Sequence, residues 1–434
     1  MKTIFISILI IFAGTAIAQP FTVGHTTITF NDASRSGGFG SGGGAGRQIQ
    51  TEIYYPSDIA GEDVSLTSGE FPVIVFGHGF AMAWDAYENI WTELVPQGFI
   101  IAFPRTEGGL IPAPAHDEFG LDLALVETKL QIENTTVSSL FYNHVTNKSA
   151  IMGHSMGGGA TFLAAESNSN ITTVIVLAPA ETSPSAVTAA TNITVPALVF
   201  TADQDLVTPA IDHHIPIYNA LNSSCKYLVN IIDGAHCYYA NSNFNCDFGE
   251  STSGGSIGIT RAVQQDIMFR YVLPWLRLYL YDDCDQHSVF ETDLALDAEV
   301  THLSSCSGFP IPTYDLNVST TTTTLTSDQS GVSYQWLECD NSNAPAPGAT
   351  NQSYSPTNSG NYAVVLGSGS CVDTSNCYFI AAVGIEEFVE TINPNKELIM
   401  IIDLLGRETK PVANTPLIYI YSDGTRKRII RIED

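Results

Sequence analysis

A serine between two glycines is the first feature of this sequence that could carry chemistry. Residues 153–157 read Gly-His-Ser-Met-Gly, which fits the G-x-S-x-G pattern of a nucleophile elbow. The apolar run 150–152 predicts a buried strand before this turn, and residues 158–165 predict a helix after it. Glycines beside the serine avoid steric collisions in so tight a turn. We therefore predict that Ser155 is a nucleophile at a helix N-terminus, where backbone N–H groups favour developing negative charge. The alternative is a glycine turn with only a structural role.

A serine hydroxyl is a weak nucleophile, and it needs a base that is itself oriented by an acid. In this kind of elbow the acid precedes the histidine in the chain. Asp205 follows the predicted strand 197–201, and His236 follows the predicted strand 227–232. Both lie in loops at the carboxyl ends of strands, where α/β sheets place their sites. We expect His236 to be the base and Asp205 the acid, with Asp203 as the alternative acid.

Structural roles for these loop residues stay open. Either aspartate could merely cap the next helix, and His236 could be a packed loop histidine. Among the other histidines, His213 and His214 are expected on the surface of a helix, and His116 and His144 lie in no motif.

The oxyanion that forms during acyl transfer needs two N–H donors. One is expected from Met156, the residue after the serine, and the other from the loop that follows the predicted strand 71–76. That loop reads His78-Gly79-Phe80, and we favour the Phe80 N–H, with the ring forming a wall of the acyl site. The alternative is that Phe80 is a core aromatic. His154 is expected to pack beneath the elbow rather than to react.

The order of elements around these residues predicts an α/β fold. Strands and helices alternate from about residue 71 to 281, which indicates a mostly parallel sheet covered by helices on both faces. Residues 283–310 are expected to form a disulfide-closed extension, so that the first domain spans 19–310. Residues 311–384 are rich in Thr, Ser and Asn, and they predict a small all-β sandwich with Trp336 in its core.

The start of the chain has the pattern of a secretory signal peptide, which we place at residues 1–18. It combines Lys2, an apolar run at 4–12 and the segment Ala16-Ile17-Ala18. No later stretch reaches transmembrane length.

All eight cysteines lie after that segment, so disulfide bonds are expected rather than metal ligation. Cys237–Cys246 and Cys284–Cys306 are plausible local bridges, although sequence alone does not fix the pairing. No metal or organic cofactor is expected, and we predict a monomer.

The formal net charge of −28 argues against nucleic-acid binding and against anionic membrane surfaces. Seven of the seventeen Lys and Arg residues fall after residue 395, so the preceding chain is very acidic. Its simplest consequence is solubility.

Residues 20–281 resemble the α/β-hydrolase branch that contains cutinase-like polyester hydrolases, bacterial lipases and chlorophyllase-like esterases. The similarity lies in the elbow and in short stretches around it: Phe30-Asn31-Asp32, Tyr54-Tyr55-Pro56, Gly153–Gly159, Asp205–Pro209, Ile217–Leu221 and Gly234-Ala235-His236. The His-Ser-Met-Gly-Gly-Gly form of the elbow is similar to enzymes that attack polyesters such as PET. The resemblance implies an oxyanion-loop aromatic, met by Phe80, and Met156 as the second donor.

The chain departs from that pattern in one place. Polyester hydrolases of this kind carry a tryptophan after the strand that follows the elbow, where it stacks on aromatic substrate. Here the region 178–183 has no aromatic residue. Substrate contacts are expected from Phe80, His154, Met156 and Ser183.

Residues 385–434 resemble the C-terminal sorting domain of type IX secretion. The matching stretches are Asn393-Pro394-Asn395, Asp403–Arg407, and Ile418-Tyr419 with the basic end that follows. The resemblance implies export by the type IX secretion machinery, to the medium or the outer cell surface. Residues 311–384 resemble Ig-like modules of secreted proteins.

Together these features predict a secreted serine carboxylic-ester hydrolase that acts on a polyester or cutin-like polymer. A general lipase or chlorophyllase-like esterase is the first alternative, and a peptidase or thioesterase on the same fold is another. The alternative outside catalysis is a surface adhesin that keeps a hydrolase scaffold.

Overall fold

The computed structural model describes residues 20–306, 314–368, 371–381, 397–422 and 424–430. The predicted signal peptide at 1–18 and the sorting-domain stretch Asn393-Pro394-Asn395 lie outside the described residues. No helix within the described ranges is both long and apolar enough to cross a bilayer.

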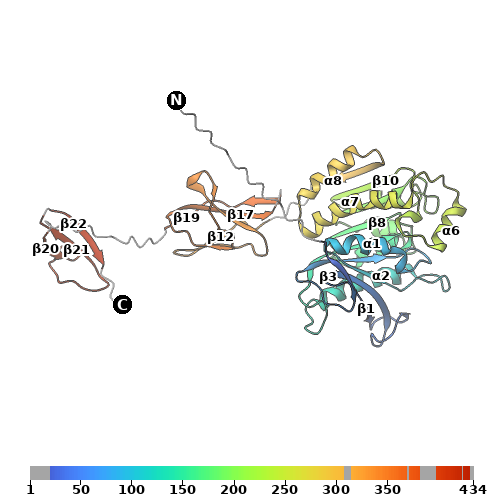
Figure 1. Ribbon diagram of the computed structural model, residues 1–434, viewed down its shortest axis with the longest axis horizontal. Coiled ribbons are helices and arrows are strands. Elements are labelled where there is room, and N and C mark those ends of the chain that lie inside the picture. The colour runs from blue at the N-terminus through green and yellow to red at the C-terminus, as the bar shows by residue number, and fades with distance from the viewer. Residues whose placement is uncertain (1–19, 307–313, 369–370, 382–396, 423, 431–434) are drawn as a thin grey trace, which may run out of the picture.

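A large, mostly parallel sheet forms the first part of the chain (Figure 1). Its path runs β11-β10-β9-β8-β7-β5-β6-β3-β1-β4, and the short β2 pairs with β3. The run from β6 through β5 to β10 is parallel, whereas β3 runs antiparallel to β6 and β1, and β11 runs antiparallel to β10. The strands are β1 Thr22–Asp32, β2 Gly38–Phe39, β3 Arg47–Ser57, β4 Gly61–Glu62, β5 Phe71–Gly77, β6 Ile100–Pro104, β7 Val145–His154, β8 Thr173–Leu177, β9 Ala197–Ala202, β10 Cys225–Ile231 and β11 Val300–Cys306.

Helices cover both faces of this sheet, which agrees with the α/β prediction (Figure 1). Strand β5 shows why the sequence folds this way, because its side chains alternate between two cores. Ile74 and Phe76 belong to one buried cluster, whereas Val73 and Val75 belong to the other. The helices are α1 Glu88–Leu94, α2 His116–Glu133, α3 Met156–Ser167, α4 Ala186–Ala190, α5 His214–Ala220, α6 Phe244–Ser253, α7 Arg261–Tyr281 and α8 Asp285–Leu296.

The disulfide pairing corrects one expectation. The Cys237–Cys246 bridge forms as predicted, but Cys284 does not pair with Cys306. Strand β11 returns antiparallel to β10, which brings Cys306 opposite Cys225, and these two form a bridge. Cys284 instead bonds to Cys371 in the following β unit, so the extension at 283–310 is not closed on itself.

Residues 314–368 and 371–381 form two antiparallel sheets around a common core (Figure 1). Trp336 is fully buried in that core, as predicted, and its Nε1 donates to the Asn351 carbonyl at 2.9 Å. A further bridge, Cys339–Cys377, closes this unit. Its strands are β12 Val318–Thr320, β13 Leu325–Ser327, β14 Tyr334–Glu338, β15 Ala344–Pro345, β16 Ser353–Tyr354, β17 Gly360–Ser368, β18 Cys371–Thr374 and β19 Tyr378–Ile380.

The last described residues form a small antiparallel sheet of β20 Leu398–Ile402, β21 Pro416–Tyr421 and β22 Arg426–Ile430. Its core is small, and it consists mainly of Ile401, Leu417 and Tyr419.

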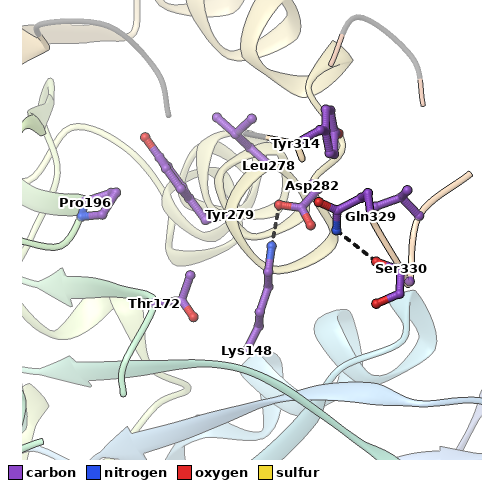
Figure 2. A pocket seen from close by; sticks show the side chains of 11 residues that line it. Lys148, Thr172, Pro196, Leu278, Tyr279, Asp282, Tyr314, Gln329 and Ser330 are labelled. Carbon is purple, nitrogen blue, oxygen red and sulfur yellow. Dashed lines mark hydrogen bonds and ion pairs between the residues drawn. The ribbon is translucent and has the colours of Figure 1, made fainter. Parts of the chain in front are cut away.

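A cavity of about 440 Å³ lies where the two-sheet unit meets the large sheet (Figure 2). Lys148, Thr172 and Pro196 contribute from the amino ends of β7, β8 and β9, and Gln329 and Ser330 contribute from the β unit. The β unit therefore lies against the amino ends of these strands, opposite to their carboxyl ends.

Candidate active site

The turn between β7 and α3 holds Ser155 in a strained conformation. Its backbone has φ 55° and ψ −120°, a positive φ that side-chain-bearing residues rarely adopt. Three hydrogen bonds hold it there: Ser155 N donates to Leu177 O at 2.9 Å, and the Ser155 carbonyl accepts from Gly159 N at 3.0 Å and Ala180 N at 2.8 Å. The structure therefore has the strand–turn–helix geometry that the elbow motif predicts.

Gly157 allows α3 to begin directly against the loop after β5. A Cβ atom at this position would lie 2.1 Å from the Gly77 carbonyl oxygen and 2.6 Å from that of His78. Any side chain would therefore separate the first turn of the helix from the segment that leads to Phe80.

Ser155, His236 and Asp205 form one hydrogen-bonded chain. Ser155 Oγ lies 2.9 Å from His236 Nε2, and His236 Nδ1 lies 2.8 Å from Asp205 Oδ2. The alternative acid, Asp203, is exposed, and it interacts only with Gln204 among the side chains described. The structure thus brings together the three residues predicted from the sequence and leaves Asp203 outside.

The direction of each hydrogen bond follows from the Asp205 carboxylate. Burial alone would raise the pKa of Asp205, but the neighbouring His236 and the Thr208 amide outweigh it and hold the pKa below its ordinary value of 3.8. The ionised carboxylate can only accept, so the His236 Nδ1–H donates to it. His236 Nε2 is then the acceptor for the Ser155 hydroxyl, and this is the arrangement that a general base requires.

The two expected oxyanion donors lie on adjoining segments. Met156 is the first residue of α3, so its N–H has no acceptor within the helix. Phe80 follows the His78-Gly79 segment, which packs against the start of the same helix. The Phe80 side chain is 49% exposed, so it is not the core aromatic of the alternative.

The buried His154 side chain forms hydrogen bonds that join the elbow to two other segments. It has no exposed surface, its Nε2 donates to the His236 carbonyl at 2.9 Å, and its Nδ1 accepts from the Tyr87 hydroxyl at 2.9 Å. That hydroxyl in turn accepts from Gly79 N at 2.8 Å. Burial holds the pKa of His154 well below its ordinary value. The expectation that His154 packs beneath the elbow is confirmed, and its expected contact with substrate is wrong because the side chain is inaccessible.

Two other histidines hold the loop after β8. His213 Nδ1 accepts from Glu181 N at 2.9 Å, and His116 Nδ1 accepts from Ser183 N at 3.0 Å. Ser183 is exposed at this loop, where a substrate contact was expected. The surface position predicted for His214 is wrong, because this residue is fully buried on the face of α5 that also carries Ile217.

Sequence reasoning missed a stacked aromatic pair on α6. Phe244 and Phe248 lie one helical turn apart, their ring centroids are 6.2 Å apart, and the side chains are 82% and 60% exposed. The Cys237–Cys246 bridge ties α6 to the residue after His236, and Asn245 Nδ2 donates to the Ala81 carbonyl at 2.7 Å. The aromatic pair is therefore carried by a helix that is fixed to both the His236 loop and the Phe80 loop.

In the part of the chain that the structure describes, no three His, Cys, Asp or Glu side chains are grouped as a metal ion would require.

The part of the chain that carries Ser155, Asp205 and His236 is similar to known proteins. A family model described as PET hydrolase-like matches residues 14–293. Bis(hydroxyethyl) terephthalate hydrolase of Streptomyces coelicolor is 28% identical over 268 residues, which cover 62% of this chain and 70% of that enzyme. Cutinase est1 of Thermobifida alba is 26% identical over 61% of this chain and 80% of its own length. A cutinase of Thermobifida fusca is 24% identical over 62% of this chain and 72% of its own length.

Proposed function

Because this chain belongs to the PET hydrolase-like family and is a carboxylic ester hydrolase, we propose that it cleaves polyesters through an acyl-enzyme formed on Ser155. His236 is the general base and acid, and Asp205 orients it. The observation that carries this proposal is the continuous chain Ser155 Oγ–His236 Nε2 at 2.9 Å and His236 Nδ1–Asp205 Oδ2 at 2.8 Å.

The first half of the reaction forms the acyl-enzyme. Ser155 Oγ attacks the ester carbonyl carbon while its proton passes to His236 Nε2. The resulting imidazolium is stabilised by the Asp205 carboxylate. When the tetrahedral intermediate collapses, the bond to the alcohol oxygen breaks, and the alcohol leaves with the proton from His236.

The second half repeats these steps with water. Water gives a proton to His236 Nε2 and attacks the acyl carbon, and collapse then releases the carboxylic acid and restores Ser155. The N–H groups of Met156 and Phe80 stabilise the oxyanion in both halves. Preorganised donors of this kind each contribute about 10²- to 10³-fold to the rate.

Three features support a polymeric ester as the substrate. The similar proteins are named for a terephthalate ester and for cutin. The β unit lies at the amino ends of the parallel strands and not at the carboxyl ends that carry the site, which suits a substrate chain that extends beyond the site. The rings of Phe80, Phe244 and Phe248 are exposed, and α6 is tied to the His236 and Phe80 loops, so these rings offer apolar surface to a polymer near the site.

A soluble-ester or lipid esterase is the second candidate. The segment 178–183, which follows β8, offers no aromatic ring to a substrate. Such an enzyme would share the chemistry of Ser155 but would not attack an aromatic film.

The proposed domain organisation places this activity outside the cell. We assign 1–18 as a signal peptide, 19–310 as the catalytic domain, 311–384 as an Ig-like domain and 385–434 as a type IX sorting domain. The two antiparallel sheets at 314–368 and 371–381 and the small terminal sheet support the last two assignments. Four disulfide bonds support an oxidising compartment.

Turnover of p-nitrophenyl butyrate and release of aromatic acid from amorphous PET film test this proposal, with the full chain beside its Ser155→Ala variant. Loss of both activities in the variant supports a serine polyester hydrolase. Turnover of the soluble ester alone supports the second candidate. Absence of any Ser155-dependent turnover contradicts the proposed mechanism and favours an adhesin.

A further inference from the structure

A second histidine lies behind the acid of the proposed triad. His214 begins α5 and has no exposed surface. Both of its ring nitrogens are used: Nδ1 lies 2.8 Å from Thr201 Oγ1, and Nε2 lies 3.1 Å from Thr208 Oγ1. The proposed mechanism uses Ser155 as nucleophile, His236 as base and Asp205 as acid. It gives no role to the His214 side chain.

The Thr208 hydroxyl is the point where the two histidines and the acid meet. Its Oγ1 lies 3.0 Å from Asp205 Oδ2, 2.9 Å from His236 Nδ1 and 3.1 Å from His214 Nε2. A hydroxyl has one proton to donate and two lone pairs. The ionised carboxylate is a stronger acceptor than the Ala178 carbonyl at 3.4 Å, so the proton points to Asp205. One lone pair then faces His214 Nε2, and the other faces the His236 Nδ1–H, whose proton Thr208 shares with the Asp205 carboxylate.

This assignment fixes the proton on His214. Burial lowers the pKa of His214 to about 3, so the ring is neutral and carries one proton near pH 7. The proton is on Nε2, because Thr208 Oγ1 has already given its own proton to Asp205. Nδ1 is then an acceptor for the Thr201 hydroxyl. Each donor in the chain Thr201, His214, Thr208 therefore points toward the carboxylate.

The Asp205 carboxylate is held from two directions. Its Oδ1 accepts from Val207 N at 2.9 Å and Thr208 N at 2.8 Å. Its Oδ2 accepts from His236 and from the Thr208 hydroxyl. The backbone amides hold one oxygen, and the Thr208 hydroxyl holds the other, which is the oxygen that meets His236 Nδ1.

We propose that His214 is a positioning residue for this esterase, which orients the Thr208 hydroxyl and thereby holds the Asp205 carboxylate against His236. The inference rests on the proposed function of the triad and extends it to Thr201, Thr208 and His214. A buried histidine could instead only fill the space between β9 and α5. The two roles differ in what a side chain of similar size without a donor would do.

Two pairs of variants separate these roles. Thr208→Val and His214→Leu keep most of the volume but remove the donor, whereas Thr208→Ser and His214→Gln keep a donor. With p-nitrophenyl butyrate we expect the first pair to lower kcat about tenfold, which corresponds to about 1.4 kcal/mol, close to the lower end of the range for one hydrogen bond to a charged group. KM should change by less than about twofold, since neither side chain contacts the ester. The second pair should retain kcat within about threefold.

The double variant Thr208→Val/His214→Leu gives an independent test. Both side chains act through one chain of hydrogen bonds, so the double variant should lose no more than the larger single loss. Additive losses would contradict the proposal. So would an unchanged kcat in Thr208→Val, which is nearly isosteric and should fold even where a leucine at 214 does not. Losses in Thr208→Ser and His214→Gln equal to those of the apolar variants would show that only packing matters.

Ser155→Ala, measured alongside, separates this inference from the proposed function. If turnover does not depend on Ser155, the proposed mechanism fails. If it depends on Ser155 but not on Thr208 or His214, only the positioning role fails.

Discussion

Oδ2 of Asp205 lies 2.8 Å from Nδ1 of His236, whereas Asp203, two residues earlier, is exposed to solvent. The two aspartates occupy one loop after β9 and have the same chemistry, so their positions alone decide which of them can orient the base. This difference supplies a matched pair of variants.

Asp205→Asn should lower kcat about 10³- to 10⁴-fold, because an amide can stabilise the wrong tautomer of His236 and cannot compensate the imidazolium. Asp203→Asn changes the charge by the same amount two residues away, and its kcat should stay within about twofold of the unmodified enzyme. The measurement is the initial rate with p-nitrophenyl butyrate, taken on variants whose Tm equals that of the unmodified enzyme. Equal losses in the two variants would contradict the assignment of the acid.

Gly157→Ala should strongly destabilise the protein. The added Cβ would lie 2.1 Å from the Gly77 carbonyl oxygen, so α3 and the loop that leads to Phe80 must separate. We expect a loss of about 3 kcal/mol or more in the free energy of unfolding, the upper range for overpacking, since backbone has to move.

Gly249→Ala in α6 is the control, because a Cβ there meets nothing within 4 Å. This change should be neutral or stabilise by about 0.5–1 kcal/mol. Urea denaturation gives the free energy of unfolding of both variants. If Gly157→Ala were as stable as Gly249→Ala, helix α3 would not lie as close to the Gly77 carbonyl as the structure shows.

The double variant Phe244→Ala/Phe248→Ala should lower the release of aromatic acid from PET film about tenfold and leave kcat/KM for p-nitrophenyl butyrate within twofold. The stacked rings are exposed on a helix tied to the His236 and Phe80 loops, so they can contact polymer that a small ester does not reach. Val137→Ala/Leu296→Ala removes two comparably exposed apolar side chains elsewhere. Film activity that falls equally in both double variants would indicate general surface hydrophobicity instead.

His214 should make the folded protein less stable as the pH falls below neutrality. The unfolded chain takes up a proton at this residue near pH 6.5, whereas burial keeps the folded ring neutral until about pH 3. The unfolded state therefore binds more protons between these values, and the free energy of unfolding decreases on acidification. Between pH 7 and pH 5 this one residue accounts for about 2 kcal/mol.

His214→Gln removes this titration and leaves His154 and the other buried histidines in place. Urea denaturation at pH 7 and pH 5 should therefore show a smaller loss in the variant than in the unmodified protein. Equal losses in the two proteins would mean that His214 is protonated in the fold or is not buried.

The sheet and the proximity of Ser155, Asp205 and His236 could be predicted because each depends on local sequence. A buried strand such as β5 is a continuous apolar run, and loops after parallel strands meet at one edge of the sheet.

Features that depend on distant contacts could not be predicted in this way. His213 and His214 are neighbours in sequence, and only the packing of α5 determines that one ring contacts the loop after β8 while the other is buried against Thr201 and Thr208. Cys306 is nearer in sequence to Cys284 than to Cys225, yet the antiparallel return of β11 decides the bridge. Phe244 and Phe248 have the i, i+4 spacing of a buried helix face, and only the packing of α6 shows that both rings are exposed.

Site-resolved labelling with a fluorophosphonate, which reacts covalently only with an activated serine, tests the central claim most directly. Tandem mass spectrometry of the full chain should find one adduct, on Ser155 Oγ, with labelling lost in His236→Ala and turnover lost in proportion to labelling. An adduct on a different serine, or full ester turnover by a protein that carries no adduct, would contradict the account.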